Sequence, residues 1–173
     1  MQMIYVVSFI LMLVATIGSH SKDEAIRISA ASDGLAQQLG AWHRAAHERC
    51  RSGCVPGTVD PRSMLPPALA DLAAYDRGYF TTRYDPVSRL LVTHMTNAFH
   101  QTESVSFGTI AASMRKMIIE GHSIGAGIWN GSSVSPLHYY YNASVPVKPP
   151  YDVPVDFMGV SIPDGSPILV TRL

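Results

Sequence analysis

Residues 121–125 read Gly-His-Ser-Ile-Gly, which matches the G-x-S-x-G spacing of the nucleophile elbow in α/β-hydrolases. That elbow places its serine between a strand and a following helix, with the acid and histidine partners later in the chain. Here a helical pattern precedes Gly121 and a hairpin-like pattern follows Gly125. After Ser123 the only histidine is His138, and no Asp or Glu lies between the two. The sequence therefore predicts no catalytic residue here and no enzyme.

A second group of reactive side chains consists of His43, His47, Cys50 and Cys54. Their spacing of i, i+4, i+7 and i+11 puts all four on one stripe of a helix. Because a helix rises 1.5 Å per residue, the first and last lie about 16 Å apart and cannot share one metal ion. A metal site is therefore limited to three ligands, with His43, His47 and Cys50 as candidates. The alternatives are free thiols and, in an oxidising compartment, a Cys50–Cys54 disulfide, which we expect.

The helix that carries these side chains is predicted from about Lys22 to Glu48. Its apolar residues recur at spacings of three and four and form one stripe: Ile28, Ala31, Leu35, Leu39, Trp42 and Ala46. Gly53 and Pro56 are expected to stop it. A short helix is predicted over 67–74, and a longer one over 106–120 that Gly121 ends.

The strands are predicted mainly in the second half of the chain. Two short strands within 78–95 flank a turn at Asp85-Pro86. One hairpin is expected around Asn130-Gly131 and another around Pro163-Asp164-Gly165. The predicted fold class is α+β, with a long N-terminal helix packed on a C-terminal antiparallel β-sheet.

Two glycines in the first hairpin give a more specific expectation. Strand alternation puts Gly125, Gly127 and Trp129 on one face. Glycine weakens a strand interior, so a pair on one face suggests that something bulky lies across it. We expect that element to be the N-terminal helix with its Trp42 stripe.

Composition and the N-terminus bound the function. The chain has 173 residues, 13 basic and 13 acidic side chains and a net charge of zero, which predicts no nucleic-acid partner. No phosphate-binding loop, dinucleotide fingerprint or carboxylate pair is found, so no cofactor is predicted. Residues 1–18 carry no charge and fit a transmembrane anchor or a cleaved signal segment. The predicted organisation is an anchor over 1–18, in contact with membrane lipid, and a single periplasmic domain over 19–173.

The chain resembles the PilM family of type IVB (thin) pilus systems in the order of its segments. An uncharged run and a helix are followed by GTVDPRSMLPPAL, by a helix running into EGHSIGAGIWNGSSVSP, and by the ending SIPDGSPILVTRL. This family comprises small inner-membrane proteins of conjugative-plasmid and related pili, distinct from the actin-like protein of the same name. The resemblance implies a non-enzymatic component of the pilin transport apparatus or pilus basal body. It also implies partners among the other pilus-assembly proteins of the inner membrane and periplasm.

Two other functions remain open. A long N-terminal helix followed by a β-rich head is also typical of a minor-pilin-like subunit that enters the fibre. However, a prepilin has a short basic leader ending in Gly before its apolar helix, whereas here Gly18 follows the apolar run. A periplasmic metal-binding protein would use the His43, His47 and Cys50 stripe.

Overall fold

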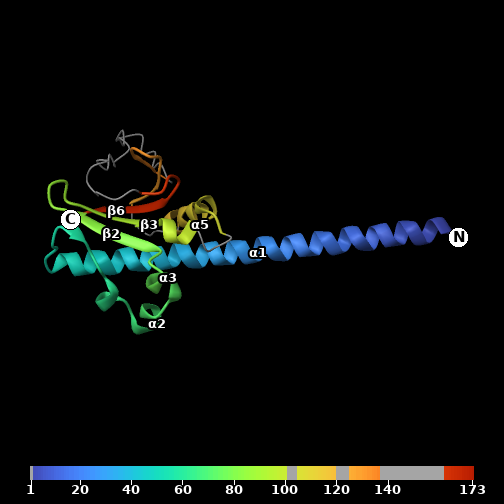
Figure 1. Cartoon of the computed structure of the whole chain (residues 1–173), viewed down its shortest axis with the longest axis horizontal. Coiled ribbons are helices and arrows are strands. Elements are labelled where there is room, and N and C mark those ends of the chain that lie inside the picture. Colours follow the sequence, from blue (N-terminus) through green and yellow to red (C-terminus); the bar gives the residue numbers. More distant parts are fainter. Residues whose placement is uncertain (1, 101–104, 120–124, 137–161) are drawn as a thin grey trace.

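The computed structural model describes residues 2–100, 105–119, 125–136 and 162–173, with side chains described from Lys22 onward (Figure 1). The helices are α1 (Gln2–Arg51), the 3-10 helix η1 (Arg62–Met64), α2 (Pro67–Ala70), α3 (Ala73–Asp76), α4 (Asn97–His100) and α5 (Phe107–Ile119). The strands are β1 (Gly57–Thr58), β2 (Phe80–Asp85), β3 (Leu90–Met95), β4 (Gly125–Trp129), β5 (Val134–Pro136) and β6 (Pro167–Arg172). The α+β class is confirmed, as are the long first helix and the helix that begins near residue 106. The short helix predicted over 67–74 is split into α2 and α3.

Within the described residues, the strands form a six-stranded antiparallel sheet with the order β1-β2-β3-β6-β4-β5. The predicted β2–β3 hairpin is confirmed, and its turn is held by the Asp85 carboxylate, which accepts hydrogen bonds from the backbone N–H groups of Val87 and Ser88 at 3.1 and 3.0 Å. The β4–β5 hairpin at Asn130-Gly131 is also confirmed. These two local pairs are joined by β6, which lies between β3 and β4.

The second predicted hairpin is corrected in part. The turn at Pro163–Gly165 forms, with the Ser166 N–H donating to the Pro163 carbonyl at 3.0 Å. However, β6 pairs with β3 on one side and β4 on the other, so both of its edges are occupied at its start. The first arm of that hairpin falls in a stretch that lies outside the described residues. The strand after the turn therefore pairs with two strands that are distant in sequence.

Helix α1 is continuous but has two different surroundings. Its N-terminal part projects away from the rest of the molecule, while its C-terminal part lies between the sheet and the segment that contains α2 and α3 (Figure 1). From residue 22 to 31 every residue is exposed except Ile28, which is half-buried. Burial begins at Ser32 and continues to Cys50. Among the described residues, no helix is both long and apolar enough to cross a bilayer.

The main core lies between α1, α5 and one face of the sheet. Trp42 of α1 contacts Tyr75 and Phe80, with ring centroids 4.8 and 6.3 Å apart. The Tyr75 hydroxyl also donates a hydrogen bond to the Gln38 carbonyl at 3.1 Å. These contacts attach the segment after η1 to the side of α1 away from the sheet, so α1 is enclosed from both sides.

The expectation about the paired glycines is wrong in its choice of neighbour. Ala126 belongs to the core cluster that contains α1, so Gly125, Gly127 and Trp129 are on the opposite face. Trp129 packs there with a second apolar cluster of the sheet: Leu90, Val92, Val134, Ile162, Ile168 and Val170. A Cβ added at Gly127 would collide with Val134 and lie 2.7 Å from the Ser135 carbonyl oxygen. Gly127 therefore accommodates the neighbouring strand β5, not the N-terminal helix.

Candidate functional site

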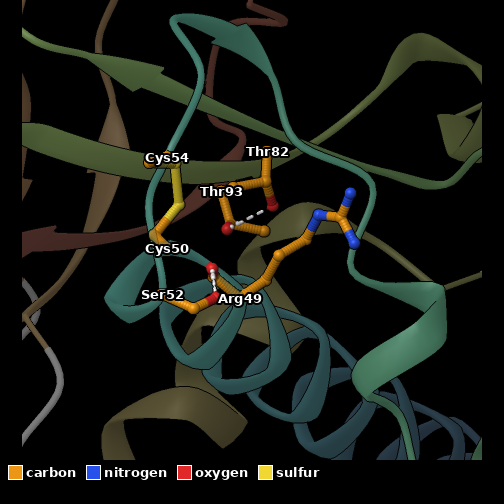
Figure 2. The surroundings of a disulfide bond; sticks show 6 residues. All are labelled: Arg49, Cys50, Ser52, Cys54, Thr82 and Thr93. Atoms are coloured by element: carbon orange, nitrogen blue, oxygen red, sulfur yellow. Dashed lines mark hydrogen bonds between the residues drawn. A yellow bond between two sulfur atoms is a disulfide. The ribbon is translucent and has the colours of Figure 1, made fainter.

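A chain of buried polar side chains connects α1 to the middle of the sheet. His43 of α1 places Nδ1 2.7 Å from Thr93 Oγ1 and Nε2 2.8 Å from Thr171 Oγ1. Thr93 Oγ1 is also 2.7 Å from Thr82 Oγ1, a contact drawn in Figure 2. One imidazole therefore reaches β3 and β6 directly, and β2 through Thr93.

Strand alternation explains why these threonines face the helix. Leu91, Thr93 and Met95 of β3 share one face, and Thr171 and Leu169 of β6 lie on that same side of the sheet. His43 sits on the stripe of α1 that faces this surface. The β-branched shape of threonine suits a strand, and its hydroxyl supplies a polar partner for a buried ring.

Burial determines the charge of His43. Its side chain is 1 % exposed, and burial, followed by the effect of a positive charge on His47, lowers the pKa of His43 to about 3. The ring is therefore neutral near pH 7. The ring nitrogen that carries the proton donates to its threonine hydroxyl, and the other nitrogen accepts. Either tautomer satisfies the ring, so the arrangement holds α1 on the sheet by hydrogen bonds as well as by packing.

Cys50 and Cys54 are joined by a disulfide at the C-terminal end of α1 (Figure 2). Gly53 adopts a φ of 121°, and its N–H donates to the Cys50 carbonyl at 3.1 Å. This left-handed conformation favours glycine and lets the chain turn back directly after the helix. Cys50 packs against Val59 and Leu91, so the disulfide joins the end of α1 to the loop that leads into β1.

The three candidate metal ligands do not form a ligand set. Both ring nitrogens of His43 are hydrogen-bonded to threonines, and the sulfur of Cys50 is in the disulfide. His47 is half-buried one turn from His43. Among the described residues, no group of three or more His, Cys, Asp or Glu side chains could hold a metal ion. His43 instead hydrogen-bonds two strands of the sheet, and Cys50 forms a covalent link to Cys54.

The three threonines are the part that sequence reasoning missed. Thr93 and Thr171 lie 50 and 128 positions from His43 along the chain. The available signal was a threonine at an inward position of otherwise apolar strands, as in RLLVTHM and PILVTRL. Pairing them with His43 requires the sheet order.

The nucleophile-elbow spacing at residues 121–125 follows helix α5 and runs into strand β4. Ser123 and His138 lie outside the described residues. The element before them is helix α5 and the element after Ser123 is strand β4, so a helix precedes the serine and a strand follows it. This order is the one that the sequence predicted, and it is the reverse of the order in an elbow.

His94 is a second buried histidine, on the face of the sheet opposite His43. It is 1 % exposed, and its Nδ1 lies 2.9 Å from the Met95 carbonyl oxygen. Burial lowers the pKa of His94, which a hydrogen bond with that carbonyl partly opposes. One buried histidine that is neutral near pH 7 thus lies on each side of β3, namely His43 of α1 on one side and His94 of β3 itself on the other.

Comparisons with models of protein families, with curated proteins and with solved structures found no match to this chain.

Proposed function

We propose that this chain is a membrane-anchored, non-enzymatic component of a type IVB pilus assembly apparatus, with its folded part from Ser32 onward, here called the head, in the periplasm. The observation that carries the proposal is the continuity of α1, which runs as one helix from the uncharged N-terminal stretch into the core of the head. A binding or scaffolding head on a helical anchor is consistent with this arrangement. The order of segments that resembles the PilM family gives the pilus role.

The length of the uncharged stretch supports the anchor. Residues 2–18 belong to α1 and contain no charged side chain. At 1.5 Å per residue they extend about 26 Å, close to the roughly 30 Å thickness of a bilayer's hydrocarbon core. A slightly short stretch can be accommodated by local thinning of the bilayer.

The disulfide supports export of the head. Structural disulfides persist in oxidising compartments such as the bacterial periplasm and are rare in the cytosol. Cys50 and Cys54 are therefore consistent with a periplasmic domain. The other reactive side chain in this region, His43, has both ring nitrogens occupied, which favours a structural role over catalysis.

A second candidate is a subunit that enters the pilus fibre, in the manner of a minor pilin. The specific observation in its favour is that half of α1 projects beyond a head built on an antiparallel sheet (Figure 1).

Deletion of the gene, with complementation, tests the proposal. We expect pili to be lost and the tagged full-length protein to fractionate with the inner membrane, resistant to carbonate and high salt. Partners should co-purify after mild solubilisation. Normal piliation in the deletion strain would contradict the pilus role. A soluble periplasmic form beginning near Ser19 or Ser21 would contradict the anchor. Recovery of the protein in sheared, purified pili would favour the fibre subunit instead.

A further inference from the structure

The boundary between the exposed and enclosed parts of α1 does not coincide with the end of its uncharged stretch. The uncharged stretch ends at Gly18, whereas continuous burial against the head begins at Ser32, preceded only by Ile28, which is half-buried against the core. Residues 19–31 lie between them and are helical throughout. At 1.5 Å per residue, this intervening segment is about 20 Å long.

The composition of the intervening segment is suited to water. It contains two basic and two acidic residues, namely Lys22, Asp23, Glu24 and Arg27. Charged side chains are costly in the hydrocarbon core, so this segment is not a continuation of a membrane span. Ile26 is 66 % exposed, and only Ile28 on the other side of the helix packs in part against the core.

The same segment is built to stay helical without support from the head. It contains neither Gly nor Pro, the two residues that most weaken a helix interior. Starting a helix is the unfavourable step, whereas extending an existing one adds a hydrogen bond for each residue fixed. The enclosed part of α1 provides the existing helix, so residues 19–31 can extend it.

We propose that residues 19–31 form a rigid helical spacer that holds the head about 20 Å from the membrane surface. The proposal rests on the membrane anchoring proposed above. A rigid spacer also fixes the rotation of the head, because each residue turns the helix by about 100°. The head is thus held in one orientation, at one distance from the membrane, relative to a partner assembled in the same membrane.

The test uses the full chain in lipid vesicles and measures energy transfer to the bilayer. A donor fluorophore is placed on Val87→Cys, at a hairpin tip that is 92 % exposed, while the native cysteines are joined to each other. The acceptor is a lipid labelled on its headgroup. Three variants change residues 21–27, which carry two positive and two negative charges and so cancel in net charge.

The first variant deletes residues 21–27, which shortens the spacer by about 10 Å and rotates the head by only about 20°. The second replaces them with seven residues of an alanine-rich, charge-balanced helical sequence and serves as the matched control. The third replaces them with seven glycine and serine residues, which keeps the number of residues but removes the rigidity.

We expect energy transfer to rise in the deletion, to match the parent in the helical control, and to broaden in distribution in the glycine–serine variant. Flotation with the vesicles is measured on the same samples. A chain that does not float contradicts the anchor, and the spacer with it. A chain that floats but shows the same transfer in the parent, the deletion and the glycine–serine variant contradicts the spacer while leaving the anchor intact.

Discussion

The two parts of α1 belong to one helix but are stabilised in different ways. From Ser32 to Cys50 the helix is enclosed by the sheet, α5 and the segment around α3, and Leu39 and Ala46 are fully buried. From Lys22 to Ala31 the helix has almost no covering. Because the backbone conformation is the same in both parts, the difference lies in what each part contacts. Packing fixes the enclosed part, whereas the exposed part depends on helix propensity and on continuity with its neighbour.

This difference matches two roles within the proposed function. The enclosed part can hold the head together, and the exposed part can set its distance from the membrane. Substitutions should therefore have very different effects according to the part in which they fall.

The largest contrast is expected between Trp42→Ala and Ile26→Ala. Trp42 is 5 % exposed and contacts Tyr75 and Phe80, whereas Ile26 is 66 % exposed. Removing a buried tryptophan costs about 3–5 kcal/mol, and an exposed substitution changes stability by about 0.5 kcal/mol or less. Denaturant unfolding of the purified full-length chain would measure both. Similar losses in the two variants would mean that the exposed part is covered in solution.

The second contrast uses a titratable side chain, His43, that belongs to the enclosed part of α1. The pKa of His43 is about 3 in the folded chain and near its usual 6.5 when unfolded, so below pH 6.5 the unfolded chain binds more protons. The contribution of neutral His43 to the free energy of unfolding is therefore fully present above pH 6.5 and is lost as pH falls toward 3. At pH 4 the loss is about 3 kcal/mol, at 1.36 kcal/mol per pH unit.

Unfolding free energies at pH 7, 5 and 4 would show this loss, and His43→Gln serves as the comparison. Glutamine can hydrogen-bond the same threonines but does not titrate. We expect the variant to lose less stability between pH 7 and 4 than the parent does. Some dependence should remain, because the pKa of His94 is also lowered by burial. If His43→Gln loses as much unfolding free energy between pH 7 and 4 as the parent does, His43 is not the source of the pH dependence.

How far the sequence predicted this fold depends on the distance along the chain. The helices and the two local hairpins follow from periodicity and turn residues that are close in sequence, such as Asp85-Pro86 and Asn130-Gly131. The position of β6 between β3 and β4 could not be predicted, because alternation fixes which face a residue is on but not which strand lies beside it. The same limit hid the threonine partners of His43. It also led to the wrong neighbour for Gly127.

Gly127 gives a third test, because it shows that β5 and not α1 determines what fits there. An added methyl group would collide with Val134 and approach the Ser135 carbonyl. Overpacking of this kind costs about 1–3 kcal/mol, so Gly127→Ala should lower the melting temperature. The double variant Gly127→Ala with Val134→Ala should recover part of the loss, while Gly127→Ala with Trp42→Ala should recover none. Recovery by the Trp42 change would restore the original assignment of α1 as the neighbour.

The smallest expected effect is a gain in stability at Gly34, near the boundary between the two parts of α1. A Cβ added at Gly34 would meet no atom within 4 Å, and the residue lies inside the helix. Alanine is favoured over glycine in a helix interior by about 1 kcal/mol, partly because the unfolded chain becomes less free. Gly34→Ala should therefore raise the melting temperature of the full-length chain by a few degrees.

Gly53→Ala is the matched control, since Gly53 also has open space around it but adopts a φ of 121° that strains any other residue. It should lower the melting temperature. A gain at both positions would mean that the turn after Cys50 does not need its left-handed residue, and a loss at Gly34 would mean that α1 bends or is covered at the boundary, in conflict with a straight spacer.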